Sequence, residues 1–247
     1  MAEKVEKIIV LKIEEYTQNE NAALVTVLGT NGVFKLFAPG LTKATSKNRQ
    51  NLQIGSICEI EYFKARFVNK LNKLKKANLL ILPHYEDNLV LKFIAKMVLF
   101  LENFKDNAKK VFDAYEECLL KYDYYVKNGF EDIETKGNPL RYMITYLVSK
   151  SLKYNGIQPN HHRCINCNSP ANLIDFKFSE GGFICGECTN NQRWTKELKS
   201  LYFLFNSLDK YILMSNKAVN DIIYNEIINH LIKNGIFVNW EILKFNK

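Results

Sequence analysis

Four cysteines are the residues in this sequence whose type and spacing most clearly support a chemical role. Cys164 and Cys167 form one C-x2-C pair, and Cys185 and Cys188 form a second pair after seventeen intervening residues. Two such pairs at this separation are typical of a zinc site, in which each pair holds one edge of a tetrahedron. Four thiolates leave no open coordination position for water or substrate. The spacing therefore predicts one structural Zn²⁺ per chain.

Other readings of these residues fit the sequence less well. Disulfides are one alternative, but Cys58 and Cys118 stand alone in apolar segments as buried thiols would, which favours a reducing compartment. His161 and His162 could each supply a nitrogen ligand. Because they lie so close to Cys164, they should compete poorly with four thiolates, and we expect both at the surface.

The sequence contains no recognisable catalytic set. There is no glycine-rich loop that would cradle a phosphate, no Gly-x-Ser-x-Gly and no His-Glu-x-x-His, and the acidic residues form no evident catalytic pair. We therefore expect this protein not to be an enzyme.

Composition and charge limit the class of protein further. The chain has 247 residues, 47 % of them apolar, which predicts one or two globular domains. It shows no signal peptide, and its most apolar stretch, residues 89–101, carries two lysines and is too short to cross a bilayer. A cytoplasmic protein is expected.

The positive charge is concentrated in the N-terminal third. The net charge is +8, and residues 1–82 hold 13 Lys and Arg against seven Glu and no Asp. Lysine outnumbers arginine 29 to 5, so AT-rich codon usage is a competing explanation for the lysine content as a whole. Codon usage does not explain where the charge lies. The distribution favours nucleic-acid binding by the N-terminal region.

That region is predicted to be a small closed barrel. Expected strands cover residues 7–13, 23–28, 33–38, 56–67 and 77–82, with a hairpin turn at Gly29-Thr30-Asn31-Gly32. Five strands without a long helix suggest an OB-fold. In the long fourth strand the apolar residues change phase, and a bulge near Tyr62-Phe63 would turn Phe63, Ala65 and Phe67 inward.

Basic residues of the barrel are the candidate DNA contacts. Two predicted loops, 40–53 and 69–76, and the end of the fourth strand carry them. The candidates are Lys43, Lys47, Arg49, Lys64, Arg66, Lys70, Lys73, Lys75 and Lys76. An ordinary solvated face is the competing reading. Tyr62, Phe34 and Phe37 are possible base-stacking residues, although such aromatics more often belong to a core.

The rest of the chain is predicted to be helical. Apolar residues recur at helical spacing through 88–155, and Asn138-Pro139 has the pattern of an N-cap followed by proline at the first helical position. Further helices are expected around 198–208 and 218–234, with 237–245 closing the chain. The predicted class is α+β: an OB-fold domain over 1–82 and an all-α domain over 83–247, into which the zinc finger 161–190 is inserted.

Two blocks of residues resemble the RecO family of bacterial recombination mediators. The first comprises Ala23-Leu24-Val25, Gly32, Ala38, Gly40, Ser46-Lys47-Asn48-Arg49 and Leu52-Gln53. The second comprises Leu147, Leu152, Gly156, Pro159, both cysteine pairs, Phe176 and Gly181-Gly182. Asn168 departs from the pattern, because the family often has glycine after the first cysteine pair.

The resemblance implies a function as well as a fold. It implies an OB-fold, a helical domain and a zinc finger. It also implies binding to single- and double-stranded DNA, annealing of complementary strands, contact with the C-terminal tail of the single-stranded DNA-binding protein (SSB), and action with RecR to load RecA.

Two other functions remain open from the residues. An OB-fold with a zinc ribbon could bind RNA. The cysteine spacing followed by Arg193 also resembles Arf-type GTPase-activating proteins, in which Arg193 would be an arginine finger. For Arg193 we favour a surface residue at a helix start, because the GTPase reading leaves the barrel unexplained.

Overall fold

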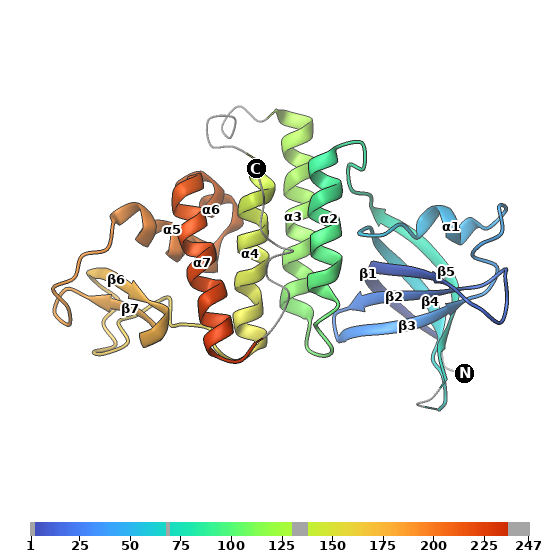
Figure 1. The fold of residues 1–247 in the computed structure, drawn as a ribbon, viewed down its shortest axis with the longest axis horizontal. Helices are drawn as coiled ribbons and strands as arrows, with labels where there is room; N and C mark the ends of the chain where they lie inside the picture. The colour runs from blue at the N-terminus through green and yellow to red at the C-terminus, as the bar shows by residue number, and fades with distance from the viewer. Residues whose placement is uncertain (1–2, 68–69, 130–137, 237–247) are drawn as a thin grey trace. The chain divides into compact units, whose positions relative to one another are not determined.

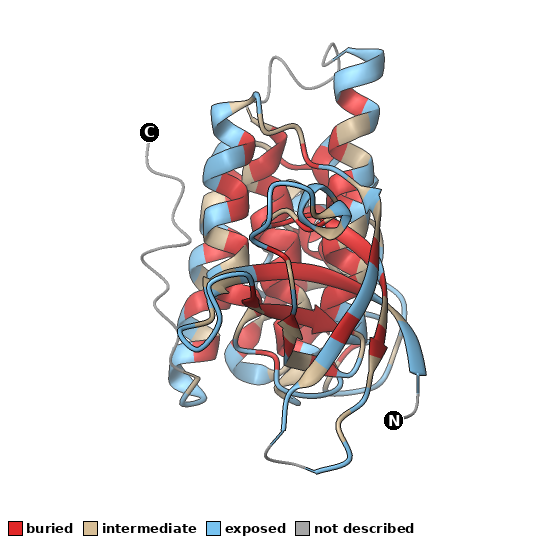
Figure 2. Ribbon diagram, turned by 90° about the vertical axis from the view of Figure 1, so that its right-hand side faces the viewer, coloured by how far each residue is buried: buried red, intermediate tan, exposed pale blue. Residues whose placement is uncertain are grey.

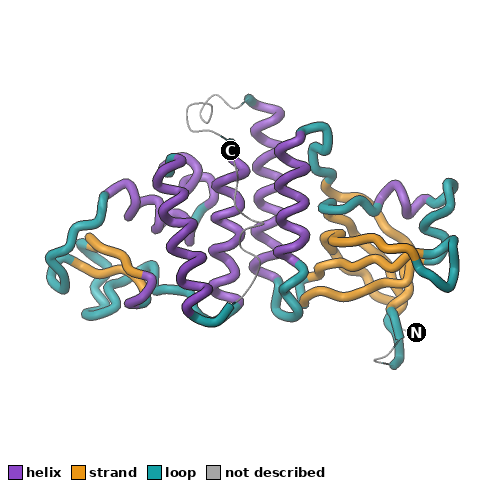
Figure 3. Tube along the Cα trace, viewed as in Figure 1, coloured by secondary structure: helices purple, strands orange, loops and turns teal. Residues whose placement is uncertain are grey.

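The structure is a computed structural model that describes residues 3–67, 70–129 and 138–236. The chain forms two compact units, Met1–Asp123 and Tyr124–Lys247. Strands make up an N-terminal barrel and one later hairpin, and the other regular elements are helices (Figure 3). The predicted α+β class is confirmed. We predicted that one domain ends at residue 82 and another begins at residue 83. This stays a prediction, because it concerns which segments fold independently.

The barrel is closed by five strands (Figure 1). They are β1 Glu3–Glu15, β2 Ala23–Gly29, β3 Gly32–Ala38, β4 Ile57–Phe63 and β5 Asn72–Ile81. Their order around the barrel is β1-β2-β3-β5-β4. All neighbours are antiparallel except β3 and β5, whose short parallel pairing at Leu36 and Phe37 closes the barrel.

The barrel core comes from side chains at alternate positions along the strands. Figure 2 colours the buried residues red. Ile8, Val25 and Ile60 are fully buried representatives of this core. The predicted turn is present, since Gly29 pairs with Gly32 across two loop residues. Gly32 has a φ of +124°, and a Cβ at this position would lie 2.2 Å from the Lys105 carbonyl oxygen. Only glycine allows that approach.

Three predicted strand limits are wrong by four or five residues. The first strand begins at Glu3 instead of residue 7. The fourth strand ends at Phe63 instead of residue 67, and the fifth begins at Asn72 instead of residue 77. The expected bulge is present as a register shift between Glu61 and Tyr62. However, β1 pairs with β4 only from Glu3 opposite Phe63 onward. Residues after Phe63 therefore have no β1 partner among the described residues, and Phe67 is 63 % exposed instead of turned inward.

Three helices belong wholly or partly to the first unit. They are α1 Lys47–Asn51, α2 Asn88–Leu101 and α3 Lys109–Asn128, the last of which ends in the second unit. Within the first unit these helices and the barrel share hydrogen bonds. The Tyr115 hydroxyl of α3 donates to the Gly55 carbonyl (2.8 Å), and the Val33 backbone N–H donates to the Phe104 carbonyl (2.9 Å).

The second unit is helical around one hairpin. Its elements are α4 Pro139–Tyr154, β6 Leu173–Lys177, the short helix η2 Phe178–Glu180, β7 Gly182–Cys185, α5 Thr195–Asn206, α6 Leu208–Met214 and α7 Lys217–Lys233. The Asn138 side chain accepts a hydrogen bond from Leu140 N–H, as predicted for an N-cap. The helix expected to continue through residue 208 instead ends at Asn206, because Ser207 caps a new helix.

Two further points complete the fold. The predicted closing segment 237–245 lies outside the described residues. Among the described helices, none combines the length and the apolar character that crossing a membrane requires.

Candidate metal centre and nucleic-acid interface

Two tight turns position the four cysteines. In the first, the backbone N–H of Asn168 donates to the Cys164 carbonyl (2.9 Å), and Cys164 N–H donates to the Ser169 carbonyl (2.8 Å). Asn168 has a φ of +64°, which asparagine tolerates better than most residues, so the departure from glycine leaves this turn intact. In the second turn, Cys188 N–H donates to the Cys185 carbonyl (3.0 Å) at the end of β7.

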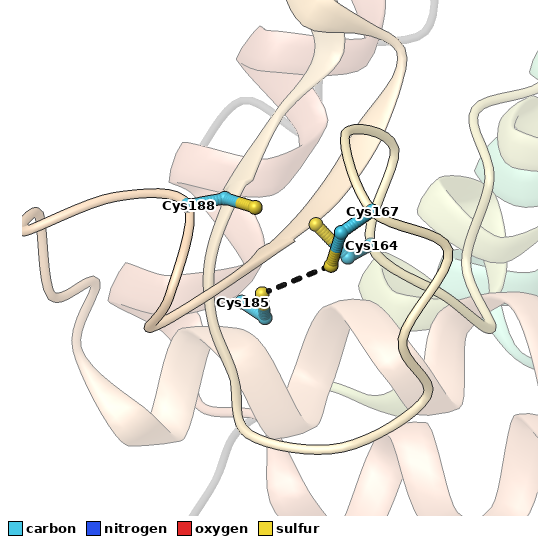
Figure 4. A group of neighbouring side chains, drawn as sticks. All are labelled: Cys164, Cys167, Cys185 and Cys188. Carbon is cyan, nitrogen blue, oxygen red and sulfur yellow. Dashed lines mark hydrogen bonds between the residues drawn. The ribbon is translucent and has the colours of Figure 1, made fainter.

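The four thiols converge on one point (Figure 4). Their sulfur atoms all lie within 4.8 Å of one another, and the Sγ atoms of Cys167 and Cys185 are 3.4 Å apart. A tetrahedral site with Zn–S bonds of about 2.3 Å separates its sulfurs by about 3.8 Å. Cys164 and Cys185 are buried, whereas Cys167 is exposed. The arrangement is one that could hold a metal ion.

The charge properties of the thiols fit a cation at their centre. Burial alone would raise the pKa of Cys164, but backbone N–H groups of Cys167, Cys185 and Asn166 near its sulfur lower that pKa to about 6. The neighbouring Cys167 and Cys185 side chains raise the pKa of Cys188 to about 12. Four thiolates this close repel one another, so a bound cation is what would let all four ionise.

The two histidines lie outside the cysteine cluster, and one of them is not the surface residue we expected. His162 is exposed, but His161 is partly buried, with its ring centroid 4.9 Å from that of Phe205. Burial lowers the pKa of His161. The neutral ring is held by its packing against Phe205 and does not require a metal ion. Among the described residues, the cluster able to hold a metal consists of the four cysteines.

We expected Arg193 at the surface, but its side chain is packed beside the β6–β7 hairpin. Its side chain is 12 % exposed. The guanidinium donates to Glu197 (Nε to Oε2, 2.7 Å), to Glu226 (Nη2 to Oε1, 2.8 Å) and to the Phe176 carbonyl (Nη1, 2.9 Å). These contacts join β6, α5 and α7. An arginine finger must reach a bound nucleotide, and this side chain is already committed to three partners.

The first group of candidate DNA contacts lies around α1. Lys43, Lys47 and Arg49 are all exposed, and Lys47 begins the helix. Arg49 donates to the Thr42 carbonyl (Nη1, 3.3 Å), which holds it across the turn that precedes α1. The segment 40–53 is therefore part loop and part helix, with its cations facing solvent.

The second group follows β4 and continues onto β5. Lys64, Arg66 and Lys70 are exposed residues of the connection between the strands. Lys73, Lys75 and Lys76 were expected in a loop, but the early start of β5 places them on this strand, where all three are exposed. Three of the nine candidates thus project from the barrel wall.

One candidate differs from its neighbours in having acidic partners. Lys75 Nζ is paired with Glu3 and lies 3.1 Å from Glu61 Oε2, and these carboxylates raise its pKa. The other exposed lysines of this strand, Lys73 and Lys76, have no ion pair with any described residue. Lys75 is the candidate least available to a phosphate.

Of the aromatic residues considered for base stacking, Tyr62 and Phe34 pack in the barrel core, whereas Phe37 is half-buried and does not belong to that core. Tyr62 is 4 % exposed and its ring lies against Phe34, with centroids 5.6 Å apart. Phe37 lies edge-to-face against Tyr16 (5.1 Å). Phe67, which was expected to face inward, is instead an exposed aromatic side chain. Its flanking basic residues were the available signal, but the assumed inward phase of the fourth strand concealed it.

Comparisons with known proteins agree with this geometry. The family model described as "Recombination protein O C terminal" matches residues 83–201, which include the cysteine cluster. A protein from Mesoplasma florum named "DNA repair protein RecO" is 26 % identical over 205 residues, which cover 80 % of this chain and 72 % of that protein. The first match covers the region after the barrel, and the second covers most of the chain. These matches confirm the resemblance of this chain to the RecO family.

Proposed function

We propose that this protein is a recombination mediator in DNA repair. In this role it binds single- and double-stranded DNA, anneals complementary strands, and acts with RecR to load RecA onto single-stranded DNA coated with SSB. The similarity to the RecO family carries the proposal. The exposed cations of the barrel support it, and so does the resemblance in the barrel residues. The protein would act on chromosomal DNA, in the cytoplasm at the nucleoid.

Annealing of this kind needs no bond chemistry. Two strands repel each other through their phosphates, and a mediator must neutralise that charge while leaving the bases free to pair. The candidates on the barrel are Lys43, Lys47, Arg49, Lys64, Arg66, Lys70, Lys73, Lys75 and Lys76. If about four of them contact phosphates of a single strand, log K should fall with log[salt] at a slope near −3. A protein that only neutralises charge and positions strands requires no catalytic residue.

The cysteine cluster would hold one structural zinc ion. Cys164, Cys167, Cys185 and Cys188 would be the ligands, and a closed set of four thiolates offers no position for substrate. The ion would fix the two cysteine turns against the hairpin β6–β7, at the small apolar cluster that includes Ile165, Leu173 and Ile184. Its binding free energy would therefore contribute to folding of the second unit.

Recruitment to coated DNA would come from the helical region. An acidic SSB tail is recognised by an apolar pocket with a basic rim, and RecR would then promote exchange of SSB for RecA. The partners of the proposal are thus DNA, the SSB tail and RecR, with RecA reached indirectly.

An annealing assay tests this function. Two complementary fluorescent strands coated with SSB are mixed with the protein, and the experiment is repeated with SSB that lacks its acidic tail. We expect annealing that depends on the tail. Annealing of naked strands alone would remove the SSB contact from the proposal. If the protein anneals neither coated nor naked DNA strands and instead binds RNA in preference to DNA, the proposed mediator function is wrong.

A matched pair of variants shows whether the barrel carries the activity. Lys70→Gln/Lys73→Gln removes two exposed cations from the barrel, and Lys199→Gln/Lys217→Gln removes two exposed cations from the helices of the second unit. Both variants change net charge equally. Annealing should slow with the first and not with the second; equal slowing would mean that overall charge, not the barrel, determines the rate.

A further inference from the structure

Phe67 is an exposed aromatic side chain in the most basic part of the barrel. It is 63 % exposed, the highest value among the described aromatic residues. Burying a phenylalanine side chain stabilises a fold, so an exposed one gives up stability that the fold would otherwise gain. Phe67 thus contributes little to the barrel core.

The segment that carries Phe67 is anchored to the barrel at its base. The β4–β5 ladder reaches Phe63 opposite Lys73. Just beyond it, the Ala65 backbone N–H donates to the Asn72 side-chain carbonyl (3.0 Å). Further out, Lys70 N–H donates to the Phe67 carbonyl (3.1 Å). These hydrogen bonds hold Phe67 and Lys70 close to each other at the end of a supported hairpin.

Cations without acidic partners lie on the same connection as Phe67 and at the start of β5. Lys64, Arg66, Lys70 and Lys73 are exposed, and none forms an ion pair with a described residue. Lys70 Nζ lies 5.7 Å from the centroid of the Phe67 ring. In Figure 2 the chain on both sides of positions 68–69 is coloured as exposed. An exposed ring beside unpaired cations is a combination that can bind a base and its phosphates together.

We propose that Phe67 stacks on an unpaired base of a single-stranded nucleic acid while Lys64, Arg66 and Lys70 contact the adjacent phosphates. This inference rests on the proposed function and makes it more specific. The bases of a duplex are already stacked on one another, so they offer Phe67 no free face. Phosphates are present in both forms. Phe67 therefore gives the barrel a preference for single strands, and the cations bind both forms.

The test uses the full chain with three substitutions. Phe67→Ala removes the ring, Phe67→Tyr keeps one, and Val5→Ala is the control because Val5 is also 63 % exposed but has no aromatic face. Fluorescence anisotropy measures binding of a single-stranded DNA, a single-stranded RNA of the same sequence and a DNA duplex, each at several salt concentrations. Melting temperatures are measured in parallel.

We expect Phe67→Ala to weaken single-strand binding about 5- to 100-fold. Duplex binding should change less than about twofold, and the salt slope of single-strand binding should stay the same because no cation is lost. Phe67→Tyr and Val5→Ala should bind like the parent. The melting temperature should not fall in any of these variants. Comparing the DNA and RNA arms shows which nucleic acid uses the ring.

The outcomes separate this inference from the function on which it rests. If the parent binds single strands tightly and Phe67→Ala binds equally well, the stacking role is wrong and the mediator function is untouched. If Phe67→Ala weakens duplex binding as much as single-strand binding, the stacking role is also wrong. If the parent binds no nucleic acid, both proposals fail. Loss of binding to anionic phospholipid vesicles, with nucleic-acid binding unchanged, would assign the ring to a membrane surface instead.

Discussion

Two tyrosine hydroxyls donate to neighbouring carbonyls of the same barrel loop, and they allow a sharp test of how the first unit is stabilised. Tyr115 of α3 donates to the Gly55 carbonyl, and Tyr85, which precedes α2, donates to the Ile54 carbonyl, both at 2.8 Å. Tyr115 is fully buried, whereas Tyr85 is partly exposed. The two bonds have the same length and chemistry but differ in access to water. We therefore expect Tyr115→Phe to destabilise the protein much more than Tyr85→Phe.

The magnitude follows from what each substitution leaves behind. In Tyr115→Phe the ring can keep its stacking with Phe93 (centroids 6.2 Å apart), but the buried Gly55 carbonyl loses its side-chain donor. An unsatisfied buried acceptor costs about 1–3 kcal/mol. For a chain of this size that corresponds to a fall in melting temperature of roughly 3–10 °C. In Tyr85→Phe water can replace the hydroxyl, so the cost should stay below about 0.5 kcal/mol.

Scanning calorimetry and urea unfolding of the two variants make the comparison. Burial raises the pKa of both tyrosines, so both hydroxyls stay protonated near neutral pH and the difference should not depend on pH there. The m-value should not change, because neither substitution alters the surface exposed on unfolding. Equal costs for the two variants, or a Tyr115→Phe variant as stable as the parent, would refute the reasoning.

Three further predictions concern the candidate sites. Lys73→Gln should make the salt slope of single-strand binding shallower by about 0.7, whereas Lys75→Gln should leave it nearly unchanged because Lys75 is already paired with two glutamates; equal shifts would contradict this. Cys185→Ser should abolish the one metal per chain measured by mass spectrometry and lower the melting temperature, and a variant that loses metal but melts like the parent would exclude a structural role. Arg193→Ala should cost about 1.5–3 kcal/mol, since three charge-assisted contacts are lost, without changing DNA affinity in anisotropy titrations.

The features that the sequence predicted well are those fixed by local chemistry. The cysteine pairs required two tight turns, and the turns are present with Asn168 in the left-handed conformation that the first one needs. The hairpin at Gly29 and Gly32 and the cap at Asn138 likewise depend on a few adjacent residues. In each case the residue type itself restricts the backbone, so neighbouring sequence was sufficient.

The features that the sequence missed depend on partners distant in the chain. Arg193 looked like a surface residue because nothing nearby shows that Glu226 of α7 lies 2.8 Å from its guanidinium. Lys75 looked equivalent to the other basic residues because its pairing with Glu3 exists only once β1, β4 and β5 come together. Charge counting along a sequence locates a basic region, but the fold decides which cations remain unpaired.

Phe67 shows the same dependence, with a consequence for function. Phe67 alternates with the basic residues Lys64 and Arg66, and this pattern fits a strand with Phe67 on either face. We predicted that the ring points inward because burying a phenyl ring stabilises a core. The end of β4 at Phe63 removes the partner strand that would have made an interior at position 67. An aromatic ring placed where the barrel has no interior gains little from folding. The proposed stacking on a base would bury this ring, and the unpaired cations beside it fit an anionic ligand.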